Sequence, residues 1–178
     1  GTKIIYTLCL FAMVVPFQME MYTLSKIANM LKLDNPWGLV MIYLGFGAGL
    51  AVFMFTGFVK SIPLEIEEAS MIDGCTPLQC FFRVVLPVMK PTCITIAILD
   101  AMWIWNDYLL PFLVIGNSDG VKTLTLELYF AKLTSGQYGN PWELIFPAVL
   151  VTIIPIVLLY IFLQKYIVAG VAEGAVKM

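Results

Sequence analysis

The 178-residue sequence contains no histidine and few charged residues, and both features restrict the classes of protein to which it can belong. Without histidine, the chain lacks the commonest metal ligand and the usual general base near neutral pH. Only 12% of the residues are charged, about half of the share in an ordinary soluble domain, whereas 61% are apolar and the mean hydropathy is +0.92. A soluble fold of this size would have too few polar side chains to cover its surface. The composition therefore excludes a soluble enzyme or a disordered tail and predicts a protein of the lipid bilayer.

Other signatures of binding and catalysis are missing as well. The four cysteines match neither a zinc site nor a redox CxxC motif, since they stand apart at positions 9, 75, 80 and 93. No G-x-x-x-x-G-K-[ST] motif is present, so by this criterion the chain is not a nucleotide-hydrolysing subunit. The net charge is −2 and no two basic residues are adjacent, which excludes a nucleic-acid partner. We expect no metal or cofactor bound by this chain.

Long apolar runs predict an all-α, polytopic bundle of transmembrane helices in a single domain, residues 1–178. A bilayer core about 30 Å thick needs about 20 helical residues to cross it. Four runs meet this requirement, at residues 4–24, 38–59, 92–115 and 144–163. Because the chain opens with Gly1 and not Met, we also expect a chain shortened at its N-terminus.

Two local patterns add detail to this bundle. Residues 24–32 have apolar side chains on one stripe only, which predicts a short amphipathic helix on the membrane surface. The GxxxG spacing from Gly45 to Gly49, inside the charge-free second run, predicts close packing against another helix.

The segment between the second and third runs, residues 60–91, is typical of a rigid pair of short helices. Pro63 suits the first turn of a helix, and Gly74 suits its end, where a residue with positive φ is usually needed. Thr76-Pro77-Leu78-Gln79 predicts a capping box that begins a second helix. Leu86-Pro87 and Pro91 are expected to break the chain again. A loop that only joined two spans would not need two caps and a glycine hinge.

The same segment resembles the EAA loop of the membrane subunits of ATP-binding-cassette importers. That pattern is E-A-A, three residues, G, nine residues and I-x-L-P, and Glu68-Ala69-Ser70, Gly74 and Val84-Val85-Leu86-Pro87 follow it. Ser70 and Val84 are the two departures. Further stretches are similar to sugar-importer permeases of the maltose-permease type, namely Ile72-Asp73-Gly74, Trp105-Asn106-Asp107-Tyr108, Gln164-Lys165-Tyr166 and residues 173–177. The resemblance covers the chain from Val15 onward.

The resemblance implies the type I fold of importer permeases and half of a pathway for sugar import. It implies that residues 60–91 form a cytoplasmic coupling helix, which contacts an ATPase dimer where ATP and magnesium are bound. The other implied partners are a second permease subunit, expected to be a different chain, and an extracytoplasmic sugar-binding protein. The implied location is the bacterial inner membrane, with the C-terminus in the cytoplasm. The residues expected to couple to the ATPase are Glu68, Ala69, Asp73, Gly74, Leu86 and Pro87.

Lysine and arginine favour the same orientation only weakly. With residues 60–91 in the cytoplasm, the inner side carries Lys3, Lys60, Arg83, Lys90, Lys165 and Lys177. The outer side then carries Lys26, Lys32, Lys122 and Lys132. The positive-inside rule agrees with this orientation but does not decide it.

Two aspartates in the third run belong to a second group of candidate residues. Asp100 and Asp107 would lie about 20° apart on one helical face, because seven residues make nearly two turns. An aspartate at the centre of a span costs roughly 2.5–3.5 kcal/mol, so these carboxylates should face protein or water. We expect this face to border the sugar pathway, with Asp100, Trp103, Asn106, Asp107 and Tyr108 as candidates. The alternative is that Asn106 and Asp107 cap a break before Pro111 or bond a neighbouring helix.

Other functions remain possible from the sequence. An ion- or proton-coupled secondary carrier would use Asp100 and Asp107 as its coupling acids, although such carriers lack an EAA loop. An intramembrane enzyme has no support, because no serine–base or metal pattern is present. Within the importers, an amino-acid or peptide transporter is disfavoured by the stretch from Trp105 to Tyr108. Dependence of uptake on ATP distinguishes an importer from a carrier.

Overall fold

The structure, a computed structural model, describes residues 1–116, 120–135 and 142–175. Within these ranges every regular element is a helix, which confirms the predicted all-α class. The elements are α1 (Thr2–Val14), α2 (Phe17–Met30), α3 (Pro36–Val59), α4 (Leu64–Ile72), α5 (Pro77–Cys80), the π-helix η1 (Phe81–Val85), α6 (Leu86–Val88), α7 (Lys90–Asn106), α8 (Leu109–Ile115), α9 (Leu124–Ser135) and α10 (Trp142–Ala175).

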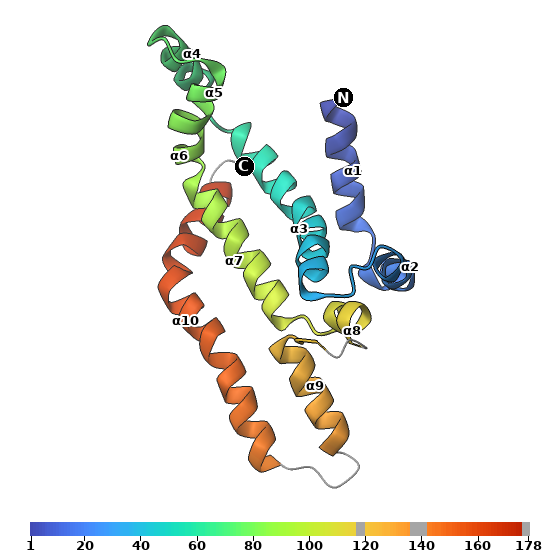
Figure 1. Cartoon of the computed structure of the whole chain (residues 1–178). Helices are drawn as coiled ribbons and strands as arrows, with labels where there is room; N and C mark the ends of the chain where they lie inside the picture. The colour runs from blue at the N-terminus through green and yellow to red at the C-terminus, as the bar shows by residue number, and fades with distance from the viewer. Residues whose placement is uncertain (117–119, 136–141, 176–178) are drawn as a thin grey trace.

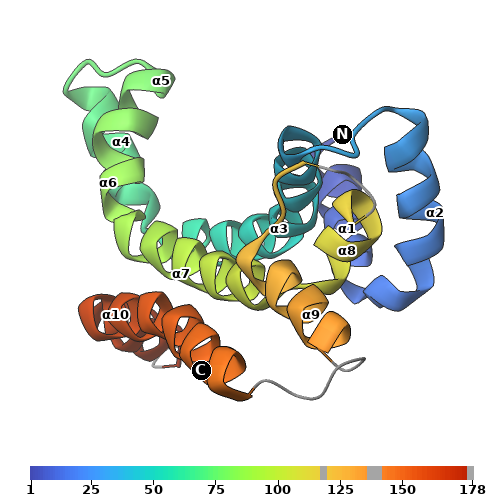
Figure 2. The ribbon, with the colours of Figure 1, turned by 60° about the horizontal axis from the view of Figure 1, so that its bottom comes forward.

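The long helices pack side by side, with α7 between α3 and α10 and with α1 against α3 (Figures 1 and 2). The chain from α4 to α6 projects beyond the long helices at one end, where α3 ends and α7 begins. Helices α2 and α8 contact each other at the opposite end, where α3 begins and α7 ends. The two groups of candidate residues are therefore tied to opposite ends of α7.

Two described helical stretches are each long and apolar enough to cross a membrane, Pro36–Val59 and Ile145–Gln164. They overlap the expected spans at residues 38–59 and 144–163. The number rises to as many as four if each of two bent helix pairs forms one span. The expected count of four is the upper of these numbers.

The first expected span, residues 4–24, is not one continuous helix. Helix α1 ends at Val14 and α2 begins at Phe17, and the two are bent by 105°. Pro16 explains the break, because a proline disfavours helical backbone at the preceding residue, and Val15 is extended with φ −69° and ψ 122°. The expected surface helix thus forms the second half of α2.

The third expected span, residues 92–115, is also interrupted. Helix α7 ends at Asn106, Asp107 is extended with φ −79° and ψ 129°, and α8 follows from Leu109. At its other end α7 already begins at Lys90, and it is bent by 66° from the helical stretch Pro77–Val88. The apolar run therefore predicted the helix but not its two ends.

The GxxxG spacing brings two helices together at only one of its glycines. A methyl group added at Gly49 would lie 3.3 Å from the carbonyl oxygen of Cys9 on α1. A methyl group added at Gly45 would meet nothing within 4 Å. Close packing therefore holds at Gly49, between α1 and α3, and not at Gly45.

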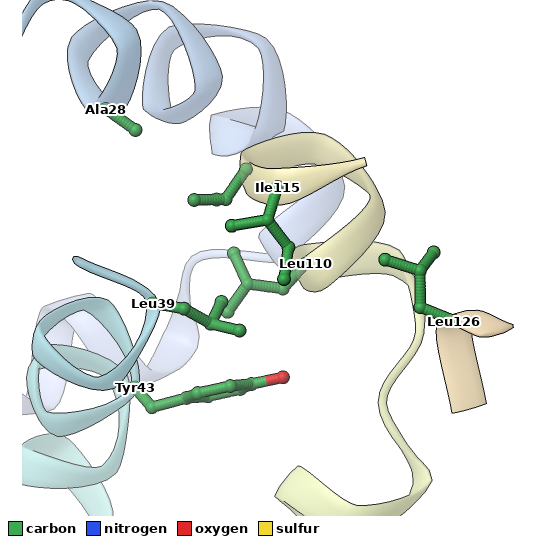
Figure 3. Packing of buried hydrophobic residues seen from close by; sticks show 7 residues of the cluster. Ala28, Leu39, Tyr43, Leu110, Ile115 and Leu126 are labelled. Carbon is green, nitrogen blue, oxygen red and sulfur yellow. The ribbon is translucent and has the colours of Figure 1, made fainter. Parts of the chain in front are cut away.

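Two apolar clusters hold the two ends of the molecule. The larger one joins α2, α3, α8 and α9, and Figure 3 shows its side chains converging from these elements. Its buried members are Ala28, Leu39, Tyr43, Leu110, Val114, Ile115 and Leu126. The smaller one lies at the root of the projecting segment, and its buried members are Cys80, Val85 and Met89. Partly buried Phe55 and Phe58 of α3 pack against the smaller cluster, so the segment is anchored on α3.

Candidate functional site

The turn between α4 and α5 is built around Gly74, as its sequence predicts. Gly74 has a φ of +86°, in the left-handed region that glycine adopts at little cost. Its N–H donates to the carbonyl oxygen of Met71 at 3.0 Å, and the N–H of Cys75 donates to that of Ser70 at 3.1 Å. Pro63 lies directly before the first residue of α4. The chain therefore enters α4 through a proline with a fixed φ and leaves it through a glycine in the left-handed region.

The start of α5 has the predicted capping box. The backbone N–H of Thr76 donates to the Oε1 of Gln79 at 2.9 Å, and the N–H of Gln79 donates to the Oγ1 of Thr76 at 3.4 Å. Pro77 occupies the first helical position, where no N–H is required. This cap orients α5 against the turn at Gly74.

The expected break at Leu86-Pro87 is absent, and the chain stays helical from α5 through η1 to α6. The N–H of Leu86 donates to the carbonyl oxygen of Phe81, five residues earlier, which is the spacing of a π turn. Pro87 follows at the second position of α6 and is accommodated directly after this wider turn. The bend occurs at Met89 instead, so the path from α5 to α7 contains a single change of direction.

Ser70, one of the departures from the EAA pattern, links α4 to α5. Its side chain is 7% exposed. Its Oγ lies 2.8 Å from the carbonyl oxygen of Glu67 and 2.9 Å from the Sγ of Cys80. An alanine at this position would have no such contact across the two helices.

The outer surface of this segment combines acidic and apolar side chains. Glu68, Ala69 and Asp73 are exposed together on α4 and the turn that follows it, beside exposed Gly74. The large apolar side chains are exposed as well, by 86% at Ile72, 72% at Leu78, 63% at Leu64, 60% at Phe82 and 50% at Met71. Leu86 and Pro87 lie apart from this group, on α6 next to the bend. Exposed apolar side chains also occur on the long helices, as at Val14 and Trp37, so the exposed carboxylates among them are what distinguishes this surface.

The predicted face of α7 lies against α3. It packs against two residues of α3 that the sequence did not indicate, Tyr43 and Gly47. The ring of Trp103 packs edge-on against that of Tyr43, with centroids 5.6 Å apart. A methyl group at Gly47 would lie 3.2 Å from the Oδ2 of Asp100, so the missing side chain makes room for this carboxylate. The only indication of this contact in the sequence was Tyr43, which carries a polar hydroxyl inside a charge-free run.

Asp107 performs the capping role that the sequence left as an alternative. Its Oδ1 accepts from the backbone N–H groups of Leu109 at 3.0 Å and Leu110 at 3.3 Å. Its Oδ2 accepts from the hydroxyl of Tyr43 at 3.1 Å. Its carbonyl oxygen accepts from the Oγ1 of Thr125 at 2.8 Å. Asp107 therefore caps α8 and also bonds the neighbouring helix α3.

The remaining candidates point to other partners. Asn106 is exposed, and its Nδ2 donates to the carbonyl oxygen of Met102 within α7 at 2.7 Å, so it does not cap the break. Tyr108 stacks on Tyr129 of α9, with centroids 5.2 Å apart. The indole N–H of Trp105 donates to the carbonyl oxygen of Thr152 on α10 at 3.0 Å. Three of the five expected pathway residues, Asp100, Trp103 and Asp107, thus lie against α3, whereas Asn106 bonds within α7 and Tyr108 stacks on α9.

Known sequences match this chain along nearly its whole length. The family described as "Binding-protein-dependent transport system inner membrane component" matches residues 1–173. The chain belongs to this family. The resemblance to importer permeases that the EAA pattern predicted is thereby confirmed, and the family description places the chain in the membrane.

Similar proteins of this permease family carry names from sugar transport. A probable starch degradation products transport system permease protein, AmyC of Thermoanaerobacterium thermosulfurigenes, is 41% identical over 177 residues. The multiple sugar-binding transport system permease protein MsmG of Streptococcus mutans is 37% identical over 176 residues. The arabinooligosaccharides transport system permease protein AraQ of Halalkalibacterium halodurans is 34% identical over 177 residues. These alignments take in 98–99% of this chain but only 63%, 62% and 62% of the three relatives.

Proposed function

We propose that this chain is a permease subunit of an ATP-binding-cassette importer for carbohydrates. The observation that carries the proposal is the projecting segment, whose exposed acidic and apolar surface is mounted on a doubly capped helix pair. The names of the relatives support a carbohydrate as the substrate. ATP and magnesium would be bound by a separate ATPase subunit, so this chain would transport without hydrolysing anything itself.

The segment is suited to transmit a push from the ATPase to the pathway. Its surface offers Glu68 and Asp73 to basic residues of the ATPase, and Ile72 and Leu78 to an apolar cleft. Gly74, the capping box and the contact between Ser70 and Cys80 hold α4 and α5 in one arrangement. Because α5, η1 and α6 form one continuous helical stretch, this stretch absorbs little of a displacement of α4 and α5, and the displacement reaches the start of α7.

The proposal includes an orientation and further partners. Residues 60–91 would lie in the cytoplasm, with α2 and α8 at the outer side of the membrane. A second permease subunit would complete the pathway, and an extracytoplasmic binding protein would deliver the sugar at the end where α8 lies. The ATPase would act as a dimer whose closure moves both permeases.

Asp100 and Trp103 are the residues of α7 that would border the pathway. Asp100 is only partly buried, and its carboxylate makes no hydrogen bond or ion pair with another described residue. Trp103 is 43% exposed. A carboxylate beside an aromatic ring is suited to bind a sugar. A proton-coupled carrier would need both aspartates for its chemistry, but Asp107 already accepts three hydrogen bonds through its side chain.

Reversal of charge on the projecting segment tests the proposal. We expect Glu68→Lys to abolish co-purification of the ATPase and ATP-dependent sugar uptake in proteoliposomes, because a basic partner surface would repel lysine. The matched control is Glu127→Lys on α9, which changes an exposed glutamate outside the segment. If Glu68→Lys assembles and transports as the control does, the coupling role is wrong. Uptake driven by a proton gradient without ATP would favour the carrier.

A further inference from the structure

Asp107 connects four helices at the end of α7 that lies away from the projecting segment. It directly follows the last residue of α7, and its side chain caps α8. The same side chain reaches α3 through Tyr43, and its carbonyl oxygen reaches α9 through Thr125. Figure 3 shows Tyr43 reaching out from α3, with its hydroxyl directed away from that helix. We call this arrangement of Tyr43, Asp107 and Thr125 the Asp107 junction.

The Asp107 junction is stiff for physical reasons. Asp107 has a short side chain, and its two oxygens are both engaged, so it has little rotational freedom left. Tyr43 is 7% exposed and is held by the ring of Trp103, which fixes the position of its hydroxyl. Hydrogen bonds to a carboxylate are about twice as strong as those between neutral groups. A displacement of the end of α7 is therefore passed on to the elements that it contacts.

We propose that Asp107 is a positioning residue that makes α3, α8 and α9 follow the movement of α7, and that it is not a ligand of the transported molecule. This inference rests on the proposed function, since the movement begins at the projecting segment. One end of α7 continues that segment, and the other end is the Asp107 junction. Without the junction, the ATPase would still displace α7, but α8 and α9 would lag behind and the pathway would open less often.

Two conservative variants remove the hydrogen bonds of the junction one at a time. Tyr43→Phe removes the hydroxyl and keeps the ring against Trp103, and Thr125→Val removes the other donor with little change in shape. Tyr22→Phe and Thr7→Val are matched controls, because Tyr22 is 81% exposed on α2 and Thr7 bonds only within α1. Neither control residue contacts the junction.

The first measurement is the number of sugar molecules taken up per ATP hydrolysed by the complete transporter in proteoliposomes. We expect Tyr43→Phe and Thr125→Val to lower this ratio several-fold, while assembly, ATP hydrolysis and the half-saturating sugar concentration stay at the level of the controls. A ligand role would instead raise the half-saturating concentration and leave the ratio unchanged, and that result would overturn the proposal. A residue that merely stabilised the fold would not change the ratio in complexes that assemble normally.

The second measurement does not depend on transport. Hydrogen exchange is followed on the full-length protein in lipid nanodiscs, with the partners that co-purify. We expect exchange in α8 to be about tenfold faster in Tyr43→Phe than in Tyr22→Phe, since a hydrogen bond to a charged group contributes at least a factor of ten. Unchanged exchange would refute the junction whatever the transport assay shows. If no ATPase co-purifies, the proposed function fails, and the exchange result still decides whether the junction exists.

Discussion

Substitution of Gly74 gives the sharpest test of why the turn between α4 and α5 has its sequence. A side chain at φ +86° costs about 1–2 kcal/mol, because the Cβ approaches the following carbonyl oxygen. A methyl group at this position meets nothing else within 4 Å, so the whole penalty comes from the backbone. Asparagine adopts this conformation more readily than other residues, and a β-branched residue adopts it least. The expected order of tolerance is glycine, asparagine, alanine and then valine.

The assay for this series is ATP-dependent uptake together with hydrogen exchange across residues 64–80. A penalty of about 1–2 kcal/mol changes the population of the native turn by a factor of about 5–30, so Gly74→Ala should show faster exchange and several-fold lower uptake. Gly57→Ala is the matched control, because it adds a methyl group to open space on the regular helix α3. If asparagine is tolerated worse than valine, Gly74 is needed for a contact and the argument from φ is wrong. If every variant transports like Gly57→Ala, the rigid turn has no role in coupling.

Three further predictions concern single contacts. Ser70→Ala should weaken the attachment of α4 to α5 by about 0.5–1.5 kcal/mol, seen as faster exchange in α4, whereas Ser61→Ala, which lies outside both helices, should leave that exchange unchanged. Gly49→Val should lower the melting temperature because its side chain would meet the Cys9 carbonyl oxygen at 3.3 Å, and Gly45→Ala should not; equal melting temperatures would contradict close packing of α1 on α3. Asp100→Asn should raise the half-saturating sugar concentration without changing assembly, and an unchanged value would remove Asp100 from the proposed pathway.

The sequence predicted the turn and the cap of the projecting segment correctly and the break at Leu86-Pro87 wrongly. The turn at Gly74 and the cap at Thr76 depend on neighbouring residues only, so both can be predicted from the local sequence. Glu68 and Asp73, which the resemblance implied as coupling residues, are exposed on α4 and in the turn after it. Local rules succeed here because each interaction closes within a few residues.

The ends of the spanning helices could not be predicted in the same way. A hydropathy run averages over its residues, so the breaks at Pro16 and Asp107 disappear inside two apolar stretches. The partner of Asp107 is Tyr43, 64 residues away, and only the folded chain brings the two together. The helical face shared by Asp100 and Trp103 was predicted correctly, because it follows from periodicity, but the helix that receives it was not.

The π turn at residues 81–85 gives a meaning to the fixed interval of nine residues in the EAA pattern. Each residue of an α-helix advances the chain by about 100° around its axis. A π turn holds one residue more than an α turn, so the stretch from Gly74 to Pro87 includes one residue that a regular α-helix would not need. Deleting a single residue there would close the π turn into an α turn rather than rotate the docking surface by about 100°, and Pro87 would lose the wide turn that accommodates it. The spacing is thus a constraint on the width of this turn, and it must be kept even where the intervening side chains are free to vary.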